Sequence, residues 1–383
     1  MQDSSEMILE PSFESSAHGR IDQVLLSIPS WVLRYQRQAE IRGTAAVFKN
    51  VFETLHKGVQ FLVVTHEEGE PHLVEWLQEL ALQDRTDLIL VPNRTKLSVW
   101  AEDLFTVSTD RTGRRWILRP ASEKRMDTIV IADAIAEFTG WGHVETESCF
   151  QSGNMLVGDD FWFLGGDAVQ GCVGGSRKLH VISSRVPVPN FEDGFESREI
   201  QLDGRKWVET CFRGNLKNTT QPIFHIDAFL TLAGRGKDGR YRVLVGDPAL
   251  AAETLGIGLP AHAMQDVFDD IADQLAQAGF DVLRNPLPLV YQDNHIAKGR
   301  HWYFASTNNA LVEIDGQKRT VWLPTYGHGD WRALEATDRL NEEIWRQLGF
   351  ETHMMTDFHP FAMNLGALHC MAKCLVRSGR EAS

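Results

Sequence analysis

The sequence has few of the features that suit a protein to nucleic acid. Its 383 residues include 38 lysines and arginines against 52 aspartates and glutamates, a formal net charge of −14 at pH 7. No block of basic residues interrupts this acidic balance. Binding DNA or RNA depends on neutralising phosphates with lysine and arginine. The composition therefore excludes a general nucleic-acid binder, and no nucleic-acid partner is expected.

Long apolar runs and targeting signals are also missing. Residues 61–64 read FLVV, a run far shorter than the roughly 20 residues that a membrane-spanning helix needs. Residues 1–19 have neither the basic start nor the apolar centre of a signal peptide. We therefore expect a soluble, cytoplasmic protein with no membrane partner.

Cysteine is scarce, and none of the five cysteines forms a C-x-x-C pair. A chain of this size would need more of them for a disulfide scaffold. We expect reduced thiols at all five positions, which are Cys149, Cys172, Cys211, Cys370 and Cys374.

Hydrophobic residues make up 43% of the chain, enough for a sizeable core. We expect residues 1–19 to be a mobile tail and residues 20–383 to form one domain, because no linker composition divides them. Strand and helix patterns alternate at the start of this domain, which indicates an α/β fold. The alternating stretches are residues 21–29, 32–57, 61–65, 71–82 and 87–92.

A second pattern repeats along the chain: a polar residue opens an apolar strand that then turns back on itself. It occurs at residues 100–107, 151–166, 225–232, 308–324 and 368–376. Turns are readable at residues 158–160, 234–239 and 315–316. Helical stretches at residues 261–278 and 331–348 then lead through Gly279 and Gly349 into strands at residues 281–287 and 350–356. The pattern predicts repeated hairpin, helix and strand units, while residues 171–220 are expected to be loops with short strands.

Five short motifs lie at the openings of these segments. They are W-A-E-D at residues 100–103, G-N at 153–154, H-I-D at 225–227, an asparagine at 309 followed by L-P-T-Y-G at 323–327, and G-A-L-H-C at 366–370. In this order they resemble the guanidino-group-modifying enzymes called penteins, which include agmatine, peptidyl-arginine and arginine deiminases and amidinotransferases. The resemblance extends over most of the chain. It implies an α/β propeller, a fan of five ββαβ units around a pseudo-fivefold axis.

The resemblance also implies which residues form the site. The catalytic residues would be the nucleophile Cys370 with His225, Asp227 and Asp103. The substrate-binding residues would be Trp100, Asp103, Asp227, Gln151, Gly153, Asn154 and Asn309. No cofactor and no metal are implied, and the partner would be a small guanidino compound or a peptidyl arginine.

These residue types suit the chemistry of a guanidinium, which is planar, cationic and stabilised by resonance. Carboxylates such as Asp103 and Asp227 grip its nitrogens through charge-assisted hydrogen bonds, and Trp100 would stack on its face. Cys370 would attack as a thiolate, its pKa lowered by an imidazolium or by the substrate cation. His225 would protonate the departing amine. On a strand, His225 and Asp227 would face one pocket while Ile226 enters the core.

Other interpretations of the same residues are less favoured. Adjacent strand residues point to opposite faces, so His369, next to Cys370, is expected to be structural. Cys374 is expected to lie in the core. A zinc site at His225 and Asp227 lacks a second closely spaced ligand pair. The glycine-rich residues 234–239 lack the complete pattern of a phosphate-binding loop and indicate a hairpin turn.

Three functions stay open at this point. The leading hypothesis is a deiminase that hydrolyses an arginine-derived guanidino group and releases ammonia. The second is an amidinotransferase, whose relatives share Ala228 after H-I-D, although residues 324–327 favour the deiminases. The third is a degraded pentein that only binds a guanidinium, because Gln151 replaces the family's usual acidic residue. Glu102 stands where deiminases often have arginine, so the substrate is left undefined. Whether the chain assembles into a homo-oligomer is also left open.

Overall fold

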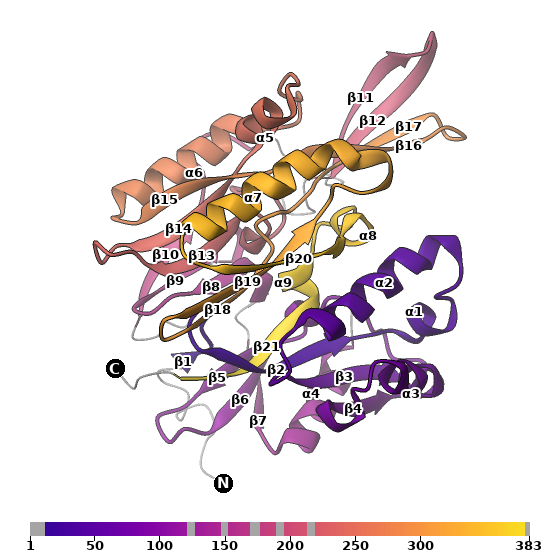
Figure 1. Ribbon diagram of the computed structural model, residues 1–383, viewed down its shortest axis with the longest axis vertical. Helices are drawn as coiled ribbons and strands as arrows, with labels where there is room; N and C mark the ends of the chain where they lie inside the picture. Colours follow the sequence, from indigo (N-terminus) through magenta and orange to yellow (C-terminus); the bar gives the residue numbers. More distant parts are fainter. Residues whose placement is uncertain are drawn as a thin grey trace.

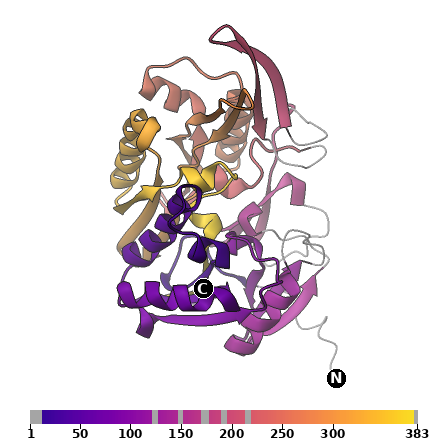
Figure 2. The same ribbon diagram turned by 90° about the vertical axis from the view of Figure 1, so that its right-hand side faces the viewer.

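The computed structural model describes residues 12–120, 127–146, 152–168, 177–188, 195–212 and 219–379. In these ranges the chain forms a mixed α/β fold, in which long helices lie outside several small sheets (Figures 1 and 2). None of the described helices is long and apolar enough to cross a membrane.

Five of the sheets share one strand motif. Two strands pair antiparallel, and a third, later strand pairs parallel to the second. In sheet order they are β21 (Ala372–Ser378), β2 (Arg20–Ser27) and β3 (Gln60–His66); β5 (Thr106–Thr109), β6 (Arg115–Pro120) and β7 (Gly142–Thr146); β8 (Met155–Val157), β9 (Phe161–Gly165) and β10 (Lys178–Ile182); β13 (Leu230–Arg235), β14 (Tyr241–Asp247) and β15 (Asp281–Pro286); and β18 (Leu311–Asp315), β19 (Lys318–Thr325) and β20 (Glu351–Asp357).

Helices connect the second and third strands in four of these sheets, as a parallel connection requires. Helix α6 (Gln265–Gln277), for example, buries Val267, Phe268 and Ile271 on one face. The connecting helices are α1 (Ser30–Arg34), α2 (Ala39–Thr54), α4 (Thr128–Thr139), α5 (Pro248–Leu255), α6 (Gln265–Gln277) and α7 (Glu335–Gln347). In addition, α3 (Glu70–Glu79) leads to an extra edge strand, β4 (Thr86–Val91), and β1 (Ser12–Phe13) pairs with β5.

The sequence-based prediction of α/β alternation is confirmed, as are hairpins at four of the five predicted segments. The fifth segment, residues 368–376, instead contains β21, which pairs with β2. The predicted turns at residues 158–160, 234–239 and 315–316 join β8 to β9, β13 to β14 and β18 to β19. The residues 234–239 therefore form a hairpin turn. The five sheets are separate and do not close into one barrel, and their arrangement as a fivefold fan stays a prediction.

A sixth sheet comes partly from the region that the sequence predicted as loops with short strands. It contains β11 (Phe195–Leu202), β12 (Arg205–Phe212), β17 (Gly299–Phe304) and β16 (Leu289–Asn294), in that order. The hairpin of β11 and β12 projects from the upper part of the molecule (Figures 1 and 2). Its polar, charged sequence gives little apolar alternation, which explains why the pattern did not predict two eight-residue strands.

The two ends of the described chain meet in one sheet, because β2 pairs antiparallel with β21. Residues 12–19, part of the predicted mobile tail, lie against the fold: Ser12 and Phe13 pair with β5, and Gly19 donates its N–H to the carbonyl of Ile314. Residues 1–11 lie outside the described ranges.

Candidate active site

The predicted site residues lie on short turns that precede the first strand of each repeated sheet. Four of these turns are helical: η4 (Ala101–Asp103), η5 (Ser152–Asn154), η7 (Ile226–Ala228) and α9 (Leu368–Met371). The fifth, at residues 306–310, precedes β18. The prediction that these residues open the strands themselves is therefore wrong, because each strand begins one to three residues later. A single helical turn is too short to show a helical period in the sequence.

Asp227 and Cys370 come into direct contact, although they are far apart in the sequence. The Cys370 thiol donates to Asp227 Oδ2 over 3.2 Å. The side chain of Asp227 is buried, and its other oxygen, Oδ1, has no hydrogen-bond partner. An unpaired buried carboxylate oxygen costs free energy unless a donor reaches it. A cationic donor that reached this oxygen would satisfy it.

Asn309 holds the cysteine turn against the turn of Asp227. Its Oδ1 accepts the backbone N–H groups of Ala367 and Cys370 at 3.0 and 3.1 Å. Its Nδ2 donates to Cys370 Sγ at 3.1 Å and to the Asp227 carbonyl at 3.2 Å. Both ends of this amide are thus used to fix the position of the sulfur.

His225 and Asp103 form a second acidic and imidazole pair in the same turns. Their Nδ1 and Oδ1 atoms lie 3.7 Å apart, and both side chains are buried. Gly153 lies against this pair: a Cβ there would come within 2.6 Å of His225 Nδ1 and 3.2 Å of Asp227 Oδ2. The missing side chain at residue 153 lets both groups face the same space.

Asn154 and Trp100 support the site from either side. Asn154 Oδ1 accepts the backbone N–H of Ile226 at 3.2 Å and the side-chain amide of buried Gln221 at 3.0 Å, which braces the turn between His225 and Asp227. The ring of Trp100 packs edge-on against Phe361, 5.6 Å between centroids. Gln151, also predicted to bind substrate, lies outside the described residues.

His369 corrects the sequence-based prediction. It was expected to point away from Cys370, as neighbours on a strand do. Because Leu368–Met371 is helical, His369 Nδ1 instead lies 2.8 Å from Asp227 Oδ2, the oxygen that also contacts Cys370. The signal in the sequence was the H-C pair at residues 369–370, which the prediction placed on a strand and the structure places on a helical turn.

The electrostatics of the site keep the thiol protonated before any ligand binds. Burial raises the pKa of Cys370 well above its usual range, and the carboxylates of Asp227 and Asp103 raise it further. Each of these carboxylates would be neutralised by a bound cation, which would lower the pKa of the sulfur again. A bound cation would therefore favour the thiolate form of Cys370.

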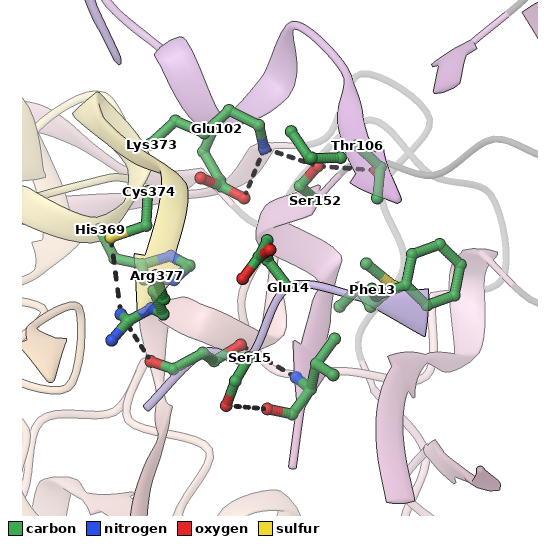
Figure 3. Close-up of a pocket in the computed structure, with 14 residues that line it drawn as sticks. Phe13, Glu14, Ser15, Glu102, Thr106, Ser152, His369, Lys373, Cys374 and Arg377 are labelled. Atoms are coloured by element: carbon green, nitrogen blue, oxygen red, sulfur yellow. Dashed lines mark hydrogen bonds and ion pairs between the residues drawn. The ribbon is translucent and has the colours of Figure 1, made fainter. Parts of the chain in front are cut away.

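A buried ion pair that the sequence analysis missed lies beside these turns (Figure 3). Lys373 Nζ lies 3.0 Å from Glu102 Oε1 and donates to Ser152 Oγ at 3.2 Å. These residues line a cavity of about 50 Å³ together with His369. A lysine within an apolar strand, at residue 373, was the available signal, since a buried lysine needs an anionic partner.

No group of three or more His, Cys, Asp or Glu side chains that suits a metal ion occurs within the described ranges. The three described cysteines, Cys211, Cys370 and Cys374, are free thiols.

Solved structures that match the chain include one of similar extent. The chain is similar to an inosamine-phosphate amidinotransferase from Streptomyces griseus, with 12% sequence identity and a TM-score of 0.44, over 97% of each chain. No protein-family model and no curated protein sequence matches the chain.

Proposed function

We propose that this protein is a cysteine-dependent enzyme that acts on the guanidino group of an arginine-derived substrate, with hydrolysis to a ureido product as the leading reaction. The observation that carries the proposal is the contact between Cys370 and Asp227, whose second carboxylate oxygen is buried and unpartnered. A guanidinium offers several N–H donors and a positive charge, which match that oxygen.

Substrate binding and activation of the nucleophile are coupled in this proposal. A guanidinium held by Asp227 and Asp103 offsets the two negative charges that raise the pKa of Cys370. The thiolate then forms only when substrate is present. Asn309, which donates to Cys370 Sγ, holds the sulfur toward the central carbon of the guanidinium.

The reaction proceeds through a covalent intermediate. The thiol proton passes to His225, and a C–S bond forms as the Cys370 thiolate attacks the guanidinium carbon. The C–N bond to the leaving nitrogen then breaks as His225 gives that nitrogen the proton. Water then attacks the thiouronium carbon and loses a proton to His225. The C–S bond breaks, which returns the thiolate and releases the ureido product; overall, water is consumed and ammonium is formed.

An amidinotransferase would use the same first half. The leaving group would then be the amine of the donor, and an acceptor amine would take the place of water at the thiouronium carbon. The sequence His225-Ile226-Asp227-Ala228, shared with the amidinotransferases that the chain resembles, favours this second candidate. Asp227, Asp103 and Cys370 would have the same roles in both reactions.

Mass spectrometry of products separates the candidates. Purified protein is incubated with arginine, agmatine, a peptidyl arginine or guanidinoacetate, each with and without glycine and lysine as acceptors. A gain of about one mass unit with ammonia release identifies hydrolysis, and an amidinated acceptor identifies transfer. Cys370→Ser should abolish either product while Cys374→Ser leaves it. Binding of these compounds without any product would contradict catalysis and support a site that only binds guanidinium.

A further inference from the structure

His369 lies between the thiol site and the polar cavity, and neither the predicted site nor the proposed reaction uses it. Its Nδ1 lies 2.8 Å from Asp227 Oδ2, and its ring lines the cavity beside Lys373 and Glu102 (Figure 3). Its side chain is 14% exposed. The cavity of about 50 Å³ has room for about three to five water molecules at 10–15 Å³ each. One nitrogen of the imidazole thus contacts Asp227, and the same residue also borders the polar cavity.

Charged groups from several elements surround this imidazole. Asp227 on η7 contacts it directly, and Glu102 on η4 and Lys373 on β21 lie on the cavity side as an ion pair. Glu14 and Arg377 complete the charged lining. Lys373 is paired with Glu102, and His369 is the basic side chain in hydrogen-bonding contact with Asp227.

Burial alone would disfavour a charged imidazole here. The hydrogen bond to Asp227 and the negative charges of Glu102 and Asp227 outweigh burial and the opposing charge of Lys373, so the pKa of His369 is raised. The ring therefore carries a proton at a higher pH than an ordinary histidine.

This contact fixes how Asp227 presents its two oxygens. Oδ2 is occupied by His369 and the Cys370 thiol, which leaves Oδ1 as the oxygen without a partner. A carboxylate held through one oxygen cannot rotate freely, and its unoccupied oxygen keeps one direction. The charge of the imidazolium also offsets part of the negative charge that Asp227 directs at the sulfur.

We propose that His369 is a positioning residue for the thiol site: as an imidazolium it orients Asp227 for the guanidinium and lowers the free-energy cost of ionising Cys370. The proposal rests on the assignment of Cys370 as the nucleophile. It adds a second histidine with a role different from that of His225, which exchanges protons with the reacting groups.

The test compares His369→Gln, which keeps an N–H donor but no charge, with His369→Phe, which keeps neither. The rate of Cys370 alkylation by iodoacetamide is measured from pH 6 to 10 without substrate. Mass spectrometry of the tryptic peptide spanning residues 347–373 reports this rate, because the peptide contains no other cysteine. Both variants should be alkylated about tenfold more slowly at neutral pH, a shift of about one pKa unit. His143→Gln is the control, since His143 pairs with Asp133 at an exposed position.

The substrate kinetics separate orientation from charge. His369→Gln should retain KM within about twofold and lose kcat at neutral pH, with partial recovery at higher pH, whereas His369→Phe should also raise KM. A merely structural role would lower the stability of both variants and leave the pH profile of alkylation where it is in the native protein. Unchanged alkylation profiles in both variants overturn the proposal.

A measurement on the native protein guards against variants that do not fold. Hydrogen exchange at the imidazole C2 position gives the pKa of His369 when it is followed in fragment ions of the same peptide that separate His369 from His353 and His359. The proposal requires a value above about 6.5, the ordinary value for histidine, and a lower value overturns it. These alkylation and exchange readouts need no turnover, so they stand or fall separately from the product assay: absence of product with a shifted alkylation profile contradicts the proposed enzyme and leaves the role of His369 toward the thiol intact.

Discussion

At the scale of single residues, the site is defined by which atoms remain without partners. Asn309 uses its amide oxygen and nitrogen to hold the turn of Cys370, and Asn154 braces the turn of Asp227 through its amide oxygen. With the backbone fixed in this way, Asp227 Oδ1 is left buried and unpartnered. The neutral amides hold the geometry, and the carboxylates supply the charge that a cation would offset.

The substitution Asp103→Asn should move two readouts in opposite directions. It removes one of the negative charges that raise the pKa of Cys370, so alkylation of Cys370 in the substrate-free protein should become several-fold faster at pH 7. In the proposed reaction the same change removes one of the carboxylates that would hold the guanidinium, so kcat/KM should fall at least about tenfold. Iodoacetamide labelling and steady-state kinetics measure the two effects. Asp133→Asn, at an exposed position, is the control, and an unchanged kcat/KM would remove Asp103 from the substrate grip.

At the scale of elements, the candidate site residues lie on turns that precede strands. The sequence pattern predicted β2, β3, β4, α6 and α7 closely, because each has enough residues to show a period of 2 or 3.6. It predicted the motifs that contain Cys370, Asp103 and His225, but placed them on strands. The turns depend on contacts over long sequence separations, such as Asn309 with Cys370, and no local pattern encodes those.

The turn before α9 brings Trp100 and Cys370 together across Gly366. A Cβ at Gly366 would lie 2.5 Å from Trp100 Cζ3 and 3.1 Å from Cys370 Cβ. Gly366→Ala should therefore displace the indole or the cysteine turn, and reduce kcat at least about tenfold, since misplacement by about 1 Å can cost a hundredfold. Gly258→Ala, where a Cβ would contact nothing within 4 Å, serves as the control. Equal activity of the two variants would mean that the contact of Trp100 with this turn has no part in catalysis.

Helix α7 anchors the turn after β19 through one buried carboxylate. Asp338 accepts the backbone N–H groups of Tyr326 and Gly327 at 2.9 and 2.7 Å. Burial raises its pKa to about 6, although these two hydrogen bonds act to lower it. Ionisation of this carboxyl is therefore less favourable in the folded state than in the unfolded chain.

The sign of this pKa shift predicts how stability changes with pH. A carboxyl group whose pKa is higher folded than unfolded stabilises the fold below about pH 4, and this contribution is lost as the pH rises through about 6. From pH 4 to pH 8, the unfolding free energy of the native protein should fall relative to that of Asp338→Asn by up to about 3 kcal/mol. Urea denaturation of both proteins across this range measures the difference, with exposed Asp330→Asn as the control. Parallel pH curves for the native protein and Asp338→Asn would contradict it.

At the scale of the whole molecule, the two ends of the described chain close the structure around the site. β21 begins two residues after Cys370 and pairs with β2. Residues 12–19 then cross several sheets: Phe13 pairs with β5, Ser16 donates its N–H to Val157, and Gly19 donates to Ile314. This segment also covers the cavity that His369 lines.

Arg377, on β21, holds this crossing segment in place. Its Nη1 donates to the carbonyls of Ala17 and Gly19 at 3.2 and 3.0 Å, and its side chain is buried. Removing this buried charged donor takes a partner from the Gly19 carbonyl, at a cost of about 3 kcal/mol, while the Ala17 carbonyl keeps the N–H of Ile314. Arg377→Met keeps much of the apolar stem and loses the guanidinium, so it should lower the unfolding free energy by that amount and loosen residues 12–19.

Two readouts follow the loosened segment directly. Limited proteolysis should cut within residues 12–19 several-fold faster than in the native protein, and Cys374, which lines the cavity, should react faster with iodoacetamide. Arg346→Met is the control, because Arg346 makes an exposed helical ion pair with Glu342, worth only about 0.5 kcal/mol. If Arg377→Met were cut and alkylated at native rates, the segment would be held by its strand pairing and backbone hydrogen bonds alone. Faster labelling of Cys374 without any change at Cys370 would further show that the cavity and the thiol site open independently. His369, which borders the cavity and contacts Asp227, would then separate the two.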